Sequence, residues 1–416
     1  MVKRIVILGL FVCVAQVRAE VRHSSDLGWT AGQDVSMQLA ALLGNGTIKA
    51  GDELKLDHTY RISGTHQLPD DFVLSAVKGG GFDVTDAAAD KNRTFLILGS
   101  RTTLRNLTIT YLNTPKLGSE GGTNPKRGVY FYPMVGIAAS GKSDIRIEYC
   151  RLEGSINHQI KLSDCARPHI IGCHILGGYW STYLTGHVTD AVFRHCLIEQ
   201  CQGDGIKTGR GGGSSGVKRA LVEHCVFQDC GRDAIDTTGG WKDSIVRHCV
   251  MRRLFSGMDI KSYFQKPEHL SPDCSNTGIL VENCTFTDMA NCITLSTLDR
   301  GLRYNNGKYF LNATSAQEYA PHDVDINNCI FERTGPSPVR MLLLKGGHSI
   351  RYNNAQFRGD GIDIVKYSNV YETFGPNSLS KEVSNALNHS VSGTLGPKAT
   401  ARPPGDTSIS FKCGPR

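Results

Sequence analysis

The feature that most constrains this chain is a short phrase that returns about every 23 residues. The phrase is a β-branched or aromatic residue, two mostly polar residues and a cysteine, with a hydrophobic residue two positions later. Seven cysteines share this position: Cys150, Cys173, Cys196, Cys225, Cys249, Cys284 and Cys329. They are separated by 23, 23, 29, 24, 35 and 45 residues, so insertions interrupt a basal period. Leu107 and Asn353 are predicted to continue the phase, and the repeat runs from about residue 95 to 370.

The repeat length predicts the fold. It is too short for paired helices, the segments lack a 3.6-residue apolar spacing, and the phrase of leucine-rich repeats is missing. Each repeat is therefore predicted to be one coil of an all-β, single-stranded, right-handed parallel β-helix, with equivalent residues stacked at ~4.8 Å. Gln33 to Leu43 has apolar residues at helical spacing and predicts an N-terminal helical cap over the first coil.

The cysteine column is predicted to point inwards as a ladder of small hydrophobic side chains, where free cysteines are commonly buried. Disulfides or a metal site remain the alternative. A second, shorter stack is predicted five residues after two of the ladder positions, at Cys201 and Cys230. A disulfide remains open among the four other cysteines, Cys165, Cys274, Cys292 and Cys413. Three histidines that precede ladder cysteines predict an outward polar stack on a strand face: His195, His224 and His248.

The two ends of the chain differ from its middle. Residues 1–19 indicate a secretory signal, with a basic start, an apolar stretch and small residues at a cleavage site. No later segment approaches the ~20 apolar residues of a membrane helix. We therefore expect a secreted or periplasmic monomer without a membrane span. Residues 20–378 are predicted to form the β-helix catalytic domain, and 379–416 a polar, proline-rich extension.

The net charge favours an anionic partner. The chain carries a formal charge of +7 and has a pI near 8.7, and such a field raises the local concentration of anions. Nucleic acid and acidic polysaccharide both fit this charge. Export favours an acidic polysaccharide and argues against nucleic acid.

Three successive repeats carry unusual charged residues after their ladder cysteine. Asp204 and Asp233 each lie eight residues after it, and Lys207 and Asp236 each lie eleven after it. Lys261 lies twelve residues after Cys249 but follows an isoleucine, as Lys207 and Asp236 do. Lys207, Asp236 and Lys261 are therefore predicted to form one outward column.

The matched offsets bring three carboxylates together, those of Asp204, Asp233 and Asp236. Like charges at close range are unfavourable unless one is protonated or a cation joins them. An oxygen-rich cluster suits Ca²⁺, which accepts six to eight oxygen ligands. The alternative is that each aspartate belongs to a turn, but that interpretation does not predict the shared offsets.

This succession resembles polysaccharide lyase family 9, the pectate lyase L type. Its members carry an Asp-Gly-Phe phrase, then Asp-Asp-Gly-Ile-Asp, then Gly-Phe-Lys on successive coils, and residues 203–261 match in order and approximate spacing. The resemblance implies that Asp204, Asp233 and Asp236 bind calcium and that Lys261 is the Brønsted base. Arg232 stands where the family has another aspartate. Either Asp259 replaces that ligand, or Arg232 holds a substrate carboxylate with its planar guanidinium.

The resemblance also implies a reaction, calcium-assisted β-elimination on a uronic-acid-containing polysaccharide. The base removes the C5 proton, a cation neutralises the adjacent carboxylate, and the glycosidic oxygen at C4 leaves. A neutral lysine is required, and we expect calcium and nearby cations to lower the pKa of Lys261. Three further side chains are predicted to contact substrate along with Arg232: Lys207, Arg210 and Tyr263.

Other functions remain open on the same scaffold. An inverting glycoside hydrolase uses two carboxyl groups ~6.5 to 9.5 Å apart and makes reducing ends without unsaturation. A uronate C5-epimerase is closer in chemistry, and Pro321-His322-Asp323 is similar to an epimerase phrase but falls outside the column. A non-catalytic polysaccharide-binding surface protein would retain the polymer without cleaving it.

Overall fold

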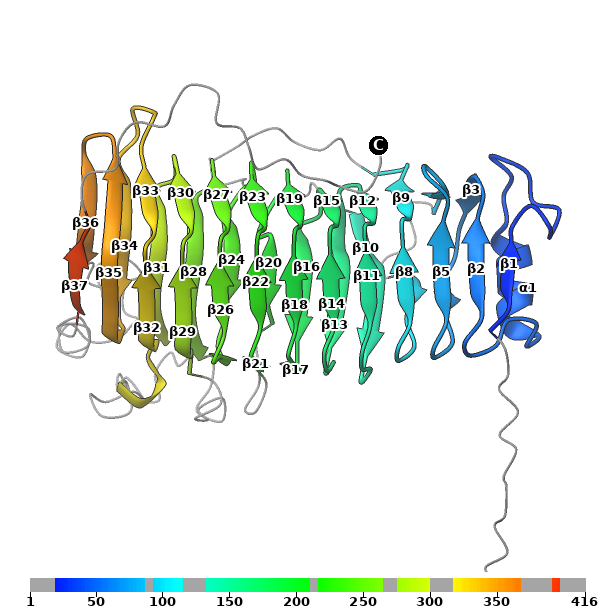
Figure 1. The fold of residues 1–416 in the computed structure, drawn as a ribbon, viewed down its shortest axis with the longest axis horizontal. Helices are drawn as coiled ribbons and strands as arrows, with labels where there is room; N and C mark the ends of the chain where they lie inside the picture. The colour runs from blue at the N-terminus through cyan, green and yellow to red at the C-terminus, as the bar shows by residue number, and fades with distance from the viewer. Residues whose placement is uncertain are drawn as a thin grey trace, which may run out of the picture.

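The computed structural model describes residues 19–86, 93–114, 132–209, 216–264, 275–299, 317–367 and 391–396. Short strands stack along one long axis, from the N-terminal end in blue to the last strands in orange and red (Figure 1). Neighbouring coils pair in parallel, in register, along all three faces. Hydrophobic side chains from every coil fill a single core inside the stack.

One face of the stack is an eleven-stranded sheet. Its strands are β4 (His66–Gln67), β7 (Thr94–Ile97), β10 (Tyr132–Ser140), β13 (Ile156–Ser163), β16 (Trp180–Thr185), β20 (Ile206–Thr208), β24 (Asp233–Thr237), β28 (Ser256–Phe264), β31 (Asn291–Asp299), β34 (Val339–Lys345) and β36 (Ile362–Tyr367).

The two other faces form one continuous sheet around a corner. The face before the corner contains β1 (Val21–His23), β2 (Glu53–Leu56), β5 (Val73–Ala76), β8 (Thr103–Arg105), β11 (Arg146–Glu148), β14 (His169–Ile171), β17 (His187–Thr189), β18 (Val192–Arg194), β21 (Gly216–Lys218), β22 (Leu221–Glu223), β25 (Trp241–Lys242), β26 (Ile245–Arg247), β29 (Thr277–Glu282), β32 (His322–Asn327), β35 (His348–Arg358) and β37 (Val391–Leu395). The face after it contains β3 (Thr59–Ile62), β6 (Gly81–Val84), β9 (Thr108–Tyr111), β12 (Arg151–Glu153), β15 (His174–Leu176), β19 (Leu197–Glu199), β23 (Val226–Gln228), β27 (Val250–Arg252), β30 (Thr285–Thr287) and β33 (Ile330–Glu332).

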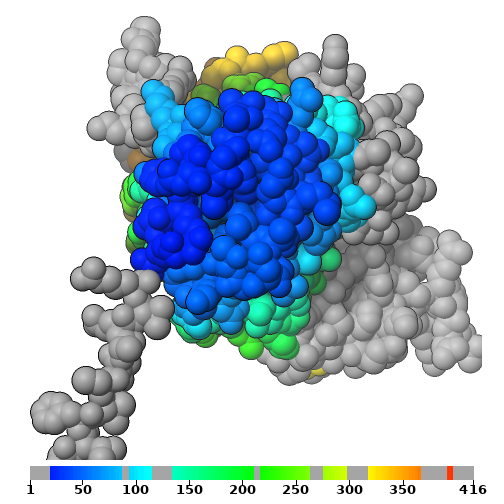
Figure 2. Space-filling model, turned by 90° about the vertical axis from the view of Figure 1, so that its right-hand side faces the viewer, coloured from blue at the N-terminus to red at the C-terminus, as the bar shows by residue number. Residues whose placement is uncertain are grey.

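The N-terminal end of the core is covered by the predicted helical cap. Helix α1 (Ser36–Gly44) follows β1, and its Leu39 is fully buried. Figure 2 looks onto this end and shows the N-terminal residues, in blue, spread across it. The cap hides the apolar edge of the first coil, as predicted. No helix among the described residues is both long enough and apolar enough to cross a membrane.

The corner between the two shorter faces explains the cysteine phrase. From β8 to β33, two residues make each corner, and the first of them has a positive φ; examples are Tyr149 (55°), His224 (52°) and Asn283 (53°). The second residue points inwards, and this is the ladder position. The seven ladder cysteines are free and buried, as predicted.

The ladder position was predicted correctly at the N-terminal end of the ladder and incorrectly at its C-terminal end. Leu107 is buried at the ladder position upstream, as expected. Downstream, Asn353 pairs with Asn327, so the residue beside Cys329 is Ala355, which is fully buried. The prediction for Asn353 is wrong by two residues, because that coil has no cysteine to mark its corner.

The three ladder histidines lie at the corner in the left-handed conformation, not on a strand face as predicted. The His195 and His224 ring centroids are 5.1 Å apart, and those of His224 and His248 are 4.8 Å apart. These separations equal the spacing of successive coils, so the rings form the predicted polar stack.

All six internal segments that separate the described ranges adjoin strands of the eleven-stranded sheet. Two of them precede β7 and β10, and four follow β20, β28, β31 and β36: 87–92, 115–131, 210–215, 265–274, 300–316 and 368–390. From β8 to β33 the corner between the two other faces keeps two residues, whereas the chain from a strand of the eleven-stranded sheet to the next strand ranges from 1 residue after β16 to 23 residues after β36. The length variation of the repeat is therefore concentrated beside this sheet. The predicted signal, 1–19, lies outside the described residues except for Ala19, and strand β37 lies within the predicted extension.

Candidate functional site

Two outward columns of side chains run along the middle of the eleven-stranded sheet. In the first column, the backbone register places Lys207 beside Asp236 and Asp236 beside Asp259. Lys261, which was predicted for this column, lies two residues further along β28. The prediction is wrong because Met258, and not Ile260, aligns with Ile235.

The second column lies three residues earlier on each strand. Asp233 pairs with Ser256 on the next coil. On the preceding side, the Gly205 amide donates to the carbonyl of Asp233 at 2.9 Å, so Asp204 precedes Asp233 on the adjacent coil. The residues between the columns fill the core, including Ile206 and Ile235, which are both fully buried. The side chains of Asp204 and Asp236 therefore reach the same outer face.

Asp236 is the centre of the charged cluster. Lys207 donates a hydrogen bond to its Oδ2, and Lys261 Nζ lies 2.9 Å from its Oδ1. Lys261 Nζ also donates to Asp259 Oδ2 at 2.7 Å. The side chain of Asp236 is fully buried, and that of Lys261 is 11% exposed. The predicted base and three of its predicted neighbours are thus in contact.

Asp204 and Arg232 lie on the outer side of this centre. Arg232 Nε is 3.7 Å from Asp204 Oδ1, and Arg232 Nη2 is 4.0 Å from Asp236 Oδ2. Lys207 Nζ is 3.7 Å from Asp204 Oδ2. The Arg232 side chain is 36% exposed whereas Asp204 is fully buried. Arg232 is therefore the cation of the cluster that is open to solvent.

Three carboxylates form a group suited to a metal ion. Oxygens of Asp204, Asp233 and Asp236 all lie within 4.8 Å of one another, and all three residues are buried. Among the described residues, neither carboxylate oxygen of Asp204 has a hydrogen-bond partner, and the same holds for Asp259 Oδ1. Asp259 borders this group without belonging to it. Buried acceptors without donors are costly, and a hard cation would satisfy them.

The carboxylates have divergent proton affinities. Burial, together with the charge of Asp236, raises the pKa of Asp204 to about 6. Burial and the neighbouring carboxylates, Asp204 first, also raise the pKa of Asp233 well above its usual range. Burial acts in the same sense on Asp236, but the ammonium groups of Lys207 and Lys261 outweigh it and hold its pKa below its usual range. Opposite shifts in one cluster are typical of functional sites.

The pKa of Lys261 is shifted in the opposite sense to the prediction. Burial lowers it, but the surrounding carboxylates, Asp236 and Asp259 foremost, outweigh burial and raise it above the usual lysine range. The prediction considered only the neighbouring cations. Four carboxylates surround Lys261 as well, those of Asp236, Asp259, Asp233 and Asp204. In the absence of an added cation, Lys261 is a charged ammonium group.

Two predicted substrate contacts are not placed. Arg210 lies outside the described residues, as does the side chain of Tyr263, whose backbone belongs to β28. Lys161 lies in the first column beside Tyr183, and Tyr183 lies beside Lys207.

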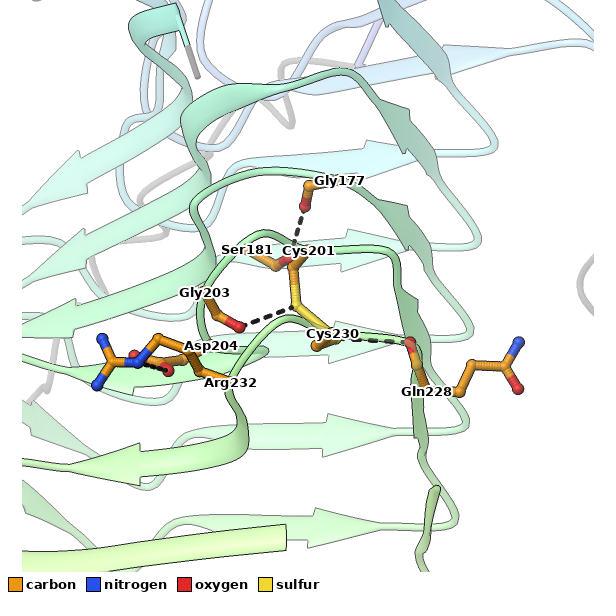
Figure 3. The surroundings of a disulfide bond; sticks show 8 residues. All are labelled: Gly177, Ser181, Cys201, Gly203, Asp204, Gln228, Cys230 and Arg232. Carbon is orange, nitrogen blue, oxygen red and sulfur yellow. Dashed lines mark hydrogen bonds and ion pairs between the residues drawn. A yellow bond between two sulfur atoms is a disulfide. The ribbon is translucent and has the colours of Figure 1, made fainter. Parts of the chain in front are cut away.

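Two features beside the site were not predicted. A disulfide joins Cys201 and Cys230, which the sequence analysis placed in a stack of thiols. Figure 3 shows this bond linking the two turns that lead into Asp204 and Arg232. The matched offsets of the two cysteines, in a chain that is expected to be exported, were the available signal. The second feature is Trp180, whose aromatic ring lies over Lys207 with 5.7 Å between Nζ and the ring centroid.

Comparison with known proteins agrees with the fold. A family model described as right handed beta helix region matches residues 82–251. A polygalacturonase from Erwinia carotovora ssp. carotovora is similar with a TM-score of 0.55 and 13% identity, over 82% of this chain and 97% of that one. An exopolygalacturonase from Thermotoga maritima has a TM-score of 0.51 and 14% identity, over 85% and 93%. An alginate lyase from Paenibacillus sp. str. FPU-7 has a TM-score of 0.44 and 11% identity, over 80% and 99%. No curated protein matches the chain in sequence. The predicted right-handed parallel β-helix is confirmed.

Proposed function

We propose that this protein is an exported polysaccharide lyase that cleaves a uronic-acid-containing polysaccharide by calcium-assisted β-elimination, with Lys261 as the base. The observation that carries the proposal is the contact of Lys261 with Asp236, at 2.9 Å, within a buried group of three carboxylates. A lysine held against a carboxylate cluster on the outer face of a β-helix is the arrangement that such a reaction requires. The net charge of +7 supports an acidic polymer as substrate.

The residues of the cluster fit calcium. Their donor atoms are all carboxylate oxygens, which Ca²⁺ prefers, and Asp204 offers two buried oxygens that accept no hydrogen bond from the described residues. Asp204, Asp233 and Asp236 would hold the ion, with Asp259 as the replacement for the aspartate that Arg232 displaces. Bound calcium would supply positive charge to these carboxylates and to the carboxylate of the substrate.

Each cation of the cluster has a distinct role in the proposal. Lys261 accepts the C5 proton, for which it must first be neutral. Because carboxylates now raise its pKa, it becomes neutral only when their charge is countered, and activity should increase at alkaline pH. Arg232, which is partly exposed, pairs with a substrate carboxylate in a bidentate fashion. Lys207 holds Asp236 in place through its hydrogen bond.

The main alternative is an inverting glycoside hydrolase. Its two carboxyl groups need ~6.5 to 9.5 Å between them to admit a water molecule. The three clustered aspartates each have one oxygen within 4.8 Å of the others, which favours a cation shared among them over a water molecule held between two carboxyl groups. The two similar polygalacturonases are named for action on polygalacturonate. At 13% and 14% identity, however, their likeness to this chain extends only to the fold.

One experiment separates the candidate functions. The mature protein is incubated with polygalacturonate, alginate and other uronate polysaccharides, and ultraviolet absorbance of the unsaturated product is followed together with reducing ends. A lyase gives both signals, loses them in chelator and regains them with calcium. Reducing ends without unsaturation would identify a hydrolase. An inverted C5 centre in an uncleaved polymer would identify an epimerase. Retention of the polymer with neither change would identify a binding protein.

A further inference from the structure

The coil that precedes the carboxylates carries aromatic rings at both outward columns. Tyr183 pairs with Lys207 in the first column. In the second column, the Ser181 amide donates to the carbonyl of Asp204 at 3.0 Å, which places Trp180 beside Asp204. His158 on the coil before pairs with Trp180. The aromatic cluster of His158, Trp180 and Tyr183 therefore directly adjoins the charged site.

The three rings form one stacked surface. The ring centroids of His158 and Trp180 are 5.5 Å apart with an interplanar angle of 15°, and those of His158 and Tyr183 are 4.8 Å apart at 21°. The Trp180 and Tyr183 centroids are 5.0 Å apart. His158 is buried, whereas Trp180 and Tyr183 are half-buried. The histidine ring thus packs against the two larger rings from the preceding coil.

The cluster differs from the aromatic stacks of the core. Phe286 and Phe331 also stack, at 5.3 Å, but both are fully buried and fill the interior. The other two tryptophans are buried as well, Trp29 at 4% exposure and Trp241 at 0%. Core packing therefore does not account for a tryptophan on the outer face of the sheet.

The next coil packs closely against these rings through two glycines, where a side chain would not fit. A Cβ atom on Gly203 would lie 3.2 Å from Trp180 Cδ1, and a Cβ atom on Gly209 would lie 2.9 Å from the Tyr183 hydroxyl. Lys207 extends between these glycines, with its ammonium group over the Trp180 ring. A cation over an aromatic face is favourable. The rings and the carboxylates are thus linked through Lys207, which also binds Asp236.

The opposite flank of the carboxylates has a different character. In the second column, Asp233 is followed by Ser256, Asn291 and Arg340 on successive coils. Arg340 Nη1 donates to Asn291 Oδ1 at 3.2 Å. Polar and cationic groups on that flank suit carboxylates, whereas aromatic faces suit the C–H face of a sugar ring.

We propose that His158, Trp180 and Tyr183 form a carbohydrate-stacking subsite, one coil N-terminal to the carboxylates, that binds a sugar ring of the substrate polymer. Bound polysaccharide then lies along the axis of the β-helix and occupies successive coils on both sides of Lys261. The identity of the polymer rests on the proposed function, but the stacking subsite is tested separately from cleavage. Binding sites on both sides of the base also make internal cleavage the expected mode.

Tryptophan fluorescence reports on the subsite directly. Trp180 is partly exposed and the two other tryptophans are buried, so Trp180 dominates any change on ligand binding. Polygalacturonate, alginate and their oligosaccharides are titrated into the full mature chain carrying Lys261→Ala, which prevents turnover in the proposal. We expect at least one polymer to shift the emission and to protect it from acrylamide. The Trp180→Phe protein should keep the affinity but lose the signal.

Affinity measurements on variants complete the test. Trp180→Ala should weaken polymer binding and raise KM roughly tenfold, with kcat changed much less, because the ring contacts a bound sugar and does not take part in proton transfer. Tyr149→Ala, which removes an exposed aromatic ring at the corner far from this sheet, is the control and should bind as the unaltered protein does.

The outcomes distinguish this proposal from the proposed function. A fluorescence response without any unsaturated product would retain the subsite and reject the lyase. Unsaturated product with an unchanged KM in Trp180→Ala would reject the subsite and retain the lyase. Absence of any emission change with every polymer would also overturn the subsite. If Trp180→Ala does not fold, Trp180→Phe still tests the subsite. Loss of the fluorescence change together with unchanged polymer affinity would support it.

Discussion

Lys261 and Asp236 lie on neighbouring coils of the β-helix, and Lys261 Nζ is 2.9 Å from Asp236 Oδ1. Asp236 lies in the first column, whereas Lys261 lies two residues beyond that column on the next strand. It also places a positive charge among carboxylates that would otherwise repel one another. Predictions about catalysis and about stability both follow from this pair.

Replacement of the base should abolish cleavage while leaving the fold intact. Lys261→Ala removes the proton acceptor, and general base catalysis contributes roughly 10²- to 10⁴-fold. We expect kcat to fall by that factor, measured by release of unsaturated product. Lys78→Ala, at an exposed turn on the N-terminal coils, is the matched control. Full activity of Lys261→Ala would exclude its assigned role.

The buried charge of Asp204 should destabilise the ion-free protein. Its pKa is raised from 3.8 to about 6, so Asp204→Asn should increase the ion-free free energy of unfolding at pH 7 by on the order of 1 to 3 kcal/mol. The same substitution removes a proposed ligand, so calcium should no longer stabilise the variant. Chemical denaturation with and without calcium measures both effects. A variant that is still stabilised by calcium would contradict the assignment of Asp204.

The calcium effect should depend on pH in a defined sense. Because the folded-state pKa of Asp204 is raised, its contribution to stability is full below about pH 4 and is lost as the pH rises through 6. Calcium competes with the same proton, so its stabilisation should grow over this interval. At a hundredfold excess over Kd, the gain should approach about 3 kcal/mol at neutral pH. Thermal melts across pH 4.5 to 7.5 test the sign, and a calcium effect that is largest at low pH would contradict it.

The Cys201–Cys230 disulfide should stabilise the two coils that carry the cluster. Replacing both cysteines with alanine should lower the free energy of unfolding by about 2 to 4 kcal/mol and weaken calcium binding. Cys196→Ala with Cys225→Ala is the matched control, because these residues lie on the same two coils with the same separation and are free. A reductant should lower the Tm of the control and of the unaltered protein. It should leave the Tm of the Cys201–Cys230 variant unchanged.

Substitution of Arg232 separates its two proposed roles. If Arg232 binds a substrate carboxylate, Arg232→Ala should raise KM roughly tenfold, which corresponds to about 1.4 kcal/mol. Arg232→Asp restores the aspartate of the resembling family and should increase calcium affinity, measured by calorimetry. Arg351→Ala, whose exposed side chain pairs with Asp325 on a different face of the β-helix, is the control. An unchanged KM in Arg232→Ala would exclude substrate binding by Arg232.

Much of this architecture could be predicted because one residue type marked each coil. The ladder cysteines fixed the corners from Cys150 to Cys329, and the shared offsets of Asp204 and Asp233 followed from them. The count failed where a coil lacked that marker, and where a coil was one residue shorter between its cysteine and the first column. Asn353 was misplaced by two residues, and Lys261 was aligned through Ile260 when Met258 is the matching residue.

The remaining errors concern interactions that a repeat pattern does not contain. The pKa of Lys261 depends on which carboxylates surround it, and that required the positions of Asp236 and Asp259 in space. The disulfide required the distance between Cys201 and Cys230, whose Cα atoms are 4.6 Å apart. Trp180 was overlooked because it lies seven residues after Cys173, one residue short of the offset that Asp204 and Asp233 share.

The placement of the variable segments beside one face has a consequence for how such a molecule changes over time. The chain that follows a strand of the eleven-stranded sheet ranges from 1 residue after β16 to 23 residues after β36, while the opposite corner keeps two residues per coil from β8 to β33. Insertions after this sheet can therefore accumulate without changing the register of the stacked coils. Substrate preference can diversify by exchange of rim segments, while the stacked scaffold and its buried charges are inherited unchanged.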